Sequence, residues 1–107
     1  LFEIENYKNI EQIQVNRLDN IINIEKYNLI KLLKIDAEGA EPEILIGSSK
    51  ILHKIKYISV DAGPERGLLQ QSTSEDVKEL LLKNNFVLIQ ENFIRQSMLF
   101  ENTKIKL

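Results

Sequence analysis

Two acid-bearing stretches contain the residues of this chain that could do chemistry. Asp36 and Glu38 follow a short apolar run that ends at Ile35, and Asp61 follows a second apolar run. A carboxylate can take a proton from a hydroxyl group or bind a hard cation, so these acids could serve acid–base or metal chemistry. Gly39 supplies the backbone freedom that a tight turn requires directly after the first run.

The residues around these acids predict a strand–helix–strand unit. Residues 32–35 read as a buried strand and residues 57–60 as a second strand. Parallel crossovers of this kind are nearly always right-handed, which places Asp36 and Asp61 at the same edge of the sheet, where α/β folds bind ligands. Gly47 falls inside the intervening helix, where it would permit close packing on the sheet. The apolar stripe of that helix, about a dozen residues long, consists of Ile44, Leu45, Ile51, Leu52 and Ile55.

The rest of the chain predicts a short helix, a long helix and a hairpin. Residues 12–16 alternate as a half-buried strand, and residues 18–22 then change to helical spacing. A second helix follows Thr73, which is placed to cap it. Residues 86–90 and 97–101 predict an antiparallel hairpin. The fold class is therefore α/β, with a parallel core and a C-terminal antiparallel hairpin in a single domain over residues 1–107.

Composition and charge exclude several classes of function. The chain has 107 residues, of which 43% are hydrophobic and 28% charged, enough for one modest core. It has no cysteine, which excludes disulfides, thiolate catalysis and cysteine-based zinc sites. A net charge of −2 provides no basic field for nucleic acid. Because no apolar run approaches the roughly 20 residues of a membrane span and no secretory signal is recognisable, we expect a cytoplasmic protein with no membrane partner.

The sequence L-K-I-D-A-E-G-A-E over residues 33–41, together with the order of the elements, resembles the second half of an FkbM-family methyltransferase. The family's hallmark reads L-K-I-D-[VA]-E-G-A-E at the end of a strand. Residues 16–19 resemble the T-L-D-like segment that precedes it, with an arginine in place of the threonine. Residues 45–47 and Asp61 are similar to the family's next helix and strand end. The resemblance covers residues 13–102.

This resemblance implies a partial Rossmann-like class I methyltransferase sheet that uses S-adenosylmethionine. The implied reaction is methyl transfer to a hydroxyl oxygen of a sugar or secondary metabolite. The family's glycine-rich half has no counterpart in this sequence, because its four glycines do not form a G-x-G-x-x-G arrangement. The chain therefore resembles the substrate-side half, its cofactor-binding residues are unassigned, and we expect it to be inactive alone and to belong to a longer protein.

The resemblance also implies roles for the acids. Asp36 would take the proton of the acceptor hydroxyl or bind that hydroxyl, the alternative being that it only shapes the turn. Glu38 could assist it as a base or help to hold a divalent ion. Asp61, Glu65 and Arg66 could bind the hydroxylated acceptor, although the last two could equally form an ion pair across the mouth of the crevice.

Two further residues of the motif are predicted to be structural. Gly39 is needed for the turn itself. Glu41 stands at the amino end of the following helix, where an acid is stabilised by free N–H groups and by the helix dipole. No residue is assigned to a metal.

Two alternatives remain open from the sequence. The first is Mg²⁺-dependent phosphoryl transfer or hydrolysis at Asp36, Glu38 and Asp61. The second is a non-catalytic α/β interaction module, because the strand over residues 32–36 would keep one unpaired apolar edge. Such an edge predicts self-association.

Overall fold

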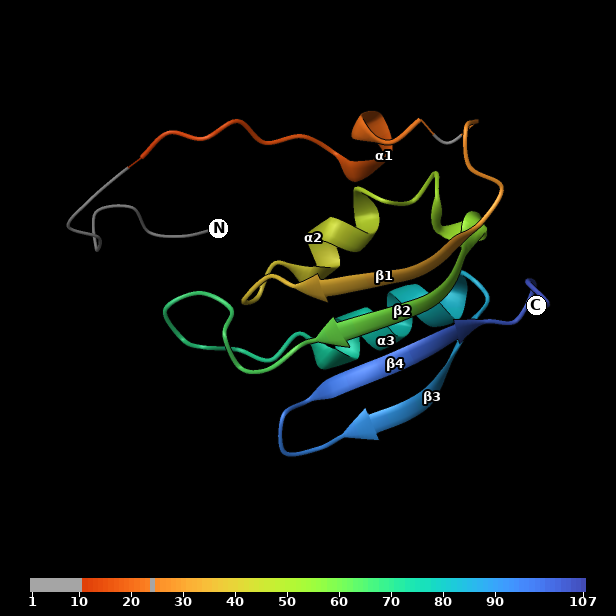
Figure 1. Cartoon of the computed structure of the whole chain (residues 1–107). Coiled ribbons are helices and arrows are strands. Elements are labelled where there is room, and N and C mark those ends of the chain that lie inside the picture. The colour runs from red at the N-terminus through yellow and green to blue at the C-terminus, as the bar shows by residue number, and fades with distance from the viewer. Residues whose placement is uncertain (1–10, 24) are drawn as a thin grey trace.

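Four strands form one mixed sheet in the order β1-β2-β4-β3 (Figure 1). The computed structural model describes residues 11–23 and 25–107. The strands are β1 (Ile30–Asp36), β2 (Ile55–Asp61), β3 (Phe86–Asn92) and β4 (Ser97–Asn102). β1 and β2 are parallel, whereas β4 is antiparallel to both of its neighbours. The predicted parallel pair and the predicted hairpin are both present, with the later hairpin strand placed next to β2.

The helices of the described residues are α1 (Leu18–Ile21), α2 (Glu41–Ile46) and α3 (Ser74–Lys83), together with the short 3₁₀ helix η2 (Leu52–Lys54). α2 and α3 contact each other, and together they cover one face of the sheet (Figure 1). None of the helices in the described ranges is long and apolar enough to cross a membrane.

The hydrophobic core lies between that face and the two helices. The register aligns Ile35 of β1 with Val60 of β2, and Val60 with Met98 of β4. Because side chains alternate between the faces of a strand, the row two residues away, which aligns Leu33, Ile58 and Phe100, points to the same side. The core consists of Ile35, Leu45, Ile51, Leu52, Ile55, Ile58, Val60, Ala62, Val77, Leu81, Phe86, Met98 and Phe100.

The opposite face of the sheet carries apolar side chains that no helix covers in the described part of the chain. Leu32 is 53% exposed, and its register partner Tyr57 is half-buried. Leu99 of β4 is also half-buried. β1 stands at the end of the strand order, so its outer edge pairs with none of the described strands.

The long helix predicted between the two parallel strands is wrong in its extent. α2 ends at Ile46, Gly47 is its C-cap, and Ile55 already belongs to β2. Three of the apolar residues assigned to one helical stripe, Ile51, Leu52 and Ile55, are nevertheless buried in the core. The spacing predicted burial correctly, but consecutive turns replace the helix after Ile46.

Contrary to the prediction, Gly47 does not pack on the sheet but against the residues at the start of α1. A β-carbon added to it would lie 3.6 Å from Cα of Arg17, and its carbonyl accepts a hydrogen bond from the amide of Asp19 at 3.0 Å. Gly47 therefore contacts the start of α1 and not the sheet.

The predicted strand over residues 12–16 is also wrong. The segment has no regular secondary structure and pairs with no described strand, and Ile13 and Val15 are 78% and 85% exposed. An alternating pattern forms a strand only where a neighbouring edge accepts its hydrogen bonds, and the described part of the chain supplies none here.

Candidate active site

The parallel register brings two of the predicted site residues side by side. Asp36 is the last residue of β1 and Asp61 the last of β2, and the two are register partners. Asp36 is exposed and Asp61 half-buried. The predicted shared edge is thus present, with two carboxylates at the carboxyl ends of adjacent strands.

The turn after β1, residues 37–39, which we call the acid-bearing turn, adopts a backbone that favours glycine. Glu38 and Gly39 have φ angles of 50° and 107°. A β-carbon at Gly39 would lie 2.5 Å from Cα of Arg66, well inside a normal contact. Gly39 is therefore required both by the backbone angle and by the close approach of the connection between β2 and α3.

Glu41 is buried and bonded to the turn that precedes it. One carboxylate oxygen, Oε2, accepts hydrogen bonds from the amides of Gly39 at 2.9 Å and Ala37 at 3.3 Å. The other, Oε1, accepts the hydroxyl of Thr73 at 2.6 Å. The prediction that free N–H groups stabilise the Glu41 carboxylate is correct. The N–H groups, however, belong to the acid-bearing turn and not to the first turn of the helix.

Arg66 is engaged in an ion pair. Its guanidinium donates to both oxygens of Glu43, at 2.6 and 2.9 Å, and to the carbonyl of Gly39 at 2.8 Å. The hydrogen-bonded guanidinium holds the pKa of Glu43 below its usual range, and the same bond raises the pKa of Arg66. Arg66 therefore forms an ion pair, as one of its two predicted alternatives had it, but the partner is Glu43 and not the neighbouring Glu65.

Glu65 shows how closely the acids lie together. The pKa of its carboxyl is raised, first because the group loses part of its contact with water. Nearby negative charges raise it further; in order of effect they belong to Glu38, Asp61, Asp36 and Glu41. The acids of both turns thus share one negative field.

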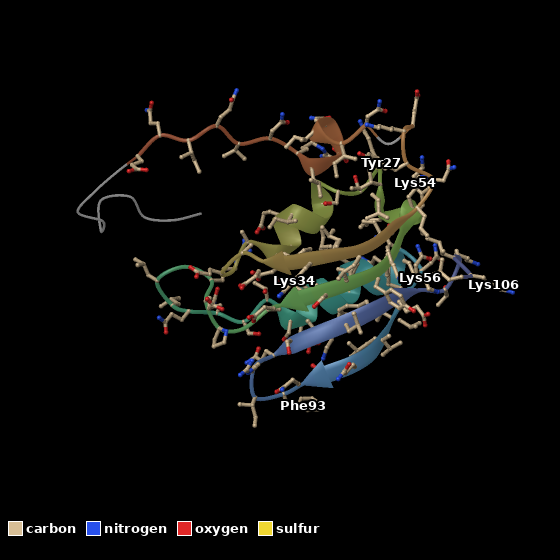
Figure 2. All side chains as sticks on the ribbon, in the orientation of Figure 1. Tyr27, Lys34, Lys54, Lys56, Phe93 and Lys106 are labelled. Atoms are coloured by element: carbon tan, nitrogen blue, oxygen red, sulfur yellow. The ribbon has the colours of Figure 1, made fainter. Side chains whose placement is uncertain are left out.

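Of the lysines labelled in Figure 2, only Lys34 of β1 lies near the acids, and the others lie at the opposite end of the sheet. Lys54, Lys56 and Lys106 gather where β2 begins, whereas Asp36 and Asp61 end their strands (Figure 2). A cationic ligand would therefore be attracted to the edge that carries the acids.

The acids do not form a metal centre. Within residues 11–23 and 25–107, no group of three or more histidine, aspartate or glutamate side chains is arranged to hold a metal ion. The Mg²⁺-dependent alternative therefore finds no support in the geometry of Asp36, Glu38 and Asp61.

An apolar groove of about 640 Å³ lies beside the acid-bearing turn, between the α1 region and α2. It begins at Ala40, directly after the turn, so an apolar part of a ligand could lie there. The lining residues are Val15, Asn16, Arg17, Leu18, Ile21, Ala40, Glu43, Ile44 and Gly47.

Two polar residues of the structure have roles that the sequence did not predict. Thr73 is the N-cap of α3, but its side chain makes no capping bond and instead reaches Glu41. Asp19 is a buried acid that pairs with Arg17 at 2.9 Å and accepts the amide of Lys50 at 3.2 Å. The one sequence signal for Asp19 is its place in the segment that resembles the family's T-L-D.

The fold and the site together define an α/β protein whose candidate site lies at the carboxyl ends of parallel strands. The family model described as the methyltransferase FkbM domain matches residues 2–88. The chain belongs to the FkbM methyltransferase family. No curated protein and no solved structure matches it.

Proposed function

We propose that this chain takes part in S-adenosylmethionine-dependent methyl transfer to a hydroxyl oxygen of a sugar or secondary metabolite. Membership of the FkbM family supports methyl transfer in general. The observation that carries the assignment to these residues is the register pairing of Asp36 with Asp61 at the strand ends. The same proposal regards the sheet as one part of a Rossmann-like methyltransferase domain in a cytoplasmic protein.

The acids would act on the acceptor. Asp36 would accept the hydroxyl proton as the oxygen gains the methyl group, since it is exposed and ends its strand. Glu38, two residues after Asp36, would assist it as a second base. Asp61 and Glu65 would hold other hydroxyl groups of the acceptor through hydrogen bonds. Arg66 would act indirectly, because its guanidinium is already bonded to Glu43 and Gly39.

The match between the described residues and the cofactor is one of charge. S-adenosylmethionine carries a positive sulfonium and an ammonium group, which the acid-bearing edge complements. When bound it supplies an electrophilic methyl group. No residue of this chain is assigned to its adenosine, because the sequence has no glycine-rich strand–turn–helix of the nucleotide-binding type.

The test is transfer of a labelled methyl group from S-adenosylmethionine to a panel of sugars, polyols and hydroxylated secondary metabolites. Both the 107-residue chain and a longer reading frame that contains it are assayed. We expect transfer by the longer polypeptide. Asp36→Asn should lower the rate by about 10²- to 10⁴-fold, the usual effect of removing a general base.

Glu79→Gln is the matched control, because it removes an exposed acid of α3 that pairs only with Lys83 among the ion pairs of the described residues. It should leave the rate unchanged. Absence of transfer to every acceptor would reject the proposed activity. An unchanged rate in Asp36→Asn would reject the role of Asp36 alone.

A further inference from the structure

The Glu41 carboxylate joins two segments that are far apart in the sequence. Its side chain is completely buried, with an exposed fraction of 0%. Oε2 bonds to two amides of the acid-bearing turn, and Oε1 bonds to the hydroxyl of Thr73. A buried carboxylate is costly unless it is hydrogen-bonded, and these three bonds satisfy it. We call this arrangement the Glu41–Thr73 bridge.

Thr73 provides a rigid attachment for the bridge. Its carbonyl accepts the amide of Val77 at 3.0 Å, the first bond of α3, and Val77 is buried in the core. Its side chain takes no part in capping that helix. The hydroxyl is therefore available to Glu41 while the Thr73 backbone is held by α3.

The segment at the other end of the bridge needs such support. Ala37 follows Asp36 directly, and its amide is one of the two backbone amides that donate to Glu41. Glu38 has a φ of 50°, a conformation that non-glycine residues rarely adopt, and Gly39 has a φ of 107°. Such backbone persists only where its surroundings enforce it. The two bonds to Glu41 enforce it on both sides of Glu38.

We propose that Glu41 and Thr73 are positioning residues, which hold the turn that carries Asp36 and Glu38 in place against α3. The inference rests on the proposed function only in treating these two acids as the reacting groups. The Glu41–Thr73 bridge sets their position relative to Asp61, although neither Glu41 nor Thr73 touches the acceptor.

The test compares Thr73→Val, which keeps the shape of the side chain but removes the hydroxyl, with Thr73→Ser, which keeps the hydroxyl. Amide hydrogen exchange is measured by NMR in the full 107-residue chain. In Thr73→Val we expect the Gly39 amide to exchange about tenfold faster, relative to the amides of β2 and β4, than in the original chain. Thr73→Ser should stay close to the original chain.

The ¹³C resonances of the Asp36 and Glu38 carboxyl groups distinguish positioning from general stabilisation. If Thr73 only stabilised the fold, its replacement would leave these resonances unchanged. They should shift in Thr73→Val and stay in place in Thr73→Ser. If Thr73→Val changes all amides by one common factor and leaves these resonances unmoved, the bridge only stabilises the fold and the proposal is wrong.

Glu41→Gln serves as a second variant if Thr73→Val does not fold. It keeps one oxygen for the turn amides but loses the charge, so we expect a smaller acceleration at Gly39 in the same direction. No acceleration at Gly39 would overturn the proposal. The exchange experiment needs neither cofactor nor acceptor, so its failure is distinguishable from a failure of the proposed methyl transfer.

Discussion

Gly39 is the residue of the motif whose identity the structure explains most directly. Its φ of 107° acts together with the close approach of Arg66, whose Cα would lie 2.5 Å from a β-carbon at this position. Gly39→Ala should therefore lower the free energy of unfolding by about 3 kcal/mol or more, the combined cost of a left-handed alanine and a displaced backbone. Urea unfolding followed by circular dichroism measures the change.

Gly67→Ala separates the two causes of that loss. Gly67 has a φ of 66°, but a β-carbon there would meet nothing within 4 Å. Gly67→Ala should lower the free energy of unfolding by about 1–2 kcal/mol, which is the cost of the left-handed backbone alone. Equal losses at the two positions would show that the contact with Arg66 contributes nothing.

At the scale of elements, α1 is attached to the end of α2 by the pair of Arg17 and Asp19. The guanidinium of Arg17 donates to both oxygens of Asp19 at 2.9 Å and also reaches the carbonyl of Ile46 at 3.2 Å. The amide of Lys50 donates to the same carboxylate. These bonds add to the apolar contact that Leu18 of this one-turn helix makes with the core.

This attachment predicts a pH dependence. The hydrogen bond from Arg17 lowers the pKa of Asp19 to about 2, below its value in an unfolded chain. Its contribution to stability is therefore complete above about pH 4 and is lost as the pH falls towards 2. Urea unfolding at pH 5 and at pH 2.5 measures the change. The free energy of unfolding should fall between the two pH values, and it should fall less in Asp19→Asn than in the original chain.

Asp76→Asn is the control, since it removes an exposed aspartate of α3 that takes no part in this pair. It should retain the decrease seen in the original chain. If Asp19→Asn and Asp76→Asn lose stability equally between the two pH values, the pair with Arg17 is not the cause.

The elements show where local pattern succeeds and where it fails. Apolar runs and alternation predicted β1, β2, β3 and β4 to within a few residues of their observed ends. The helical spacing after Pro42 extended the helix by two turns too many, because residues buried by successive turns can mimic a helical stripe. The strand over residues 12–16 failed for a different reason, since pairing needs a partner that local sequence does not specify.

At the scale of the whole molecule, β1 has an outer edge that pairs with no described strand, next to an uncovered face that includes Leu32. Unpaired edges with exposed apolar residues favour pairing with another chain. We expect the 107-residue chain to self-associate at high concentration. Leu32→Lys should weaken this association, as measured by analytical ultracentrifugation over a concentration series.

Leu82→Lys is the matched control. Leu82 is 61% exposed, similar to Leu32, but it lies on α3 and not on the sheet edge. It should leave the association unchanged. A chain that is monomeric at every concentration would contradict the expectation.

The sequence by itself determined the four strands of the sheet, the need for Gly39 and the meeting of Asp36 with Asp61, because each of these follows from local spacing and from the handedness of a parallel crossover. Only the tertiary structure decided that Thr73 bonds to Glu41 and Arg66 to Glu43. These partners are separated by 32 and 23 positions in the chain. A polar side chain has several possible partners, and only the packing of α2, α3 and the β2–α3 connection selects among them.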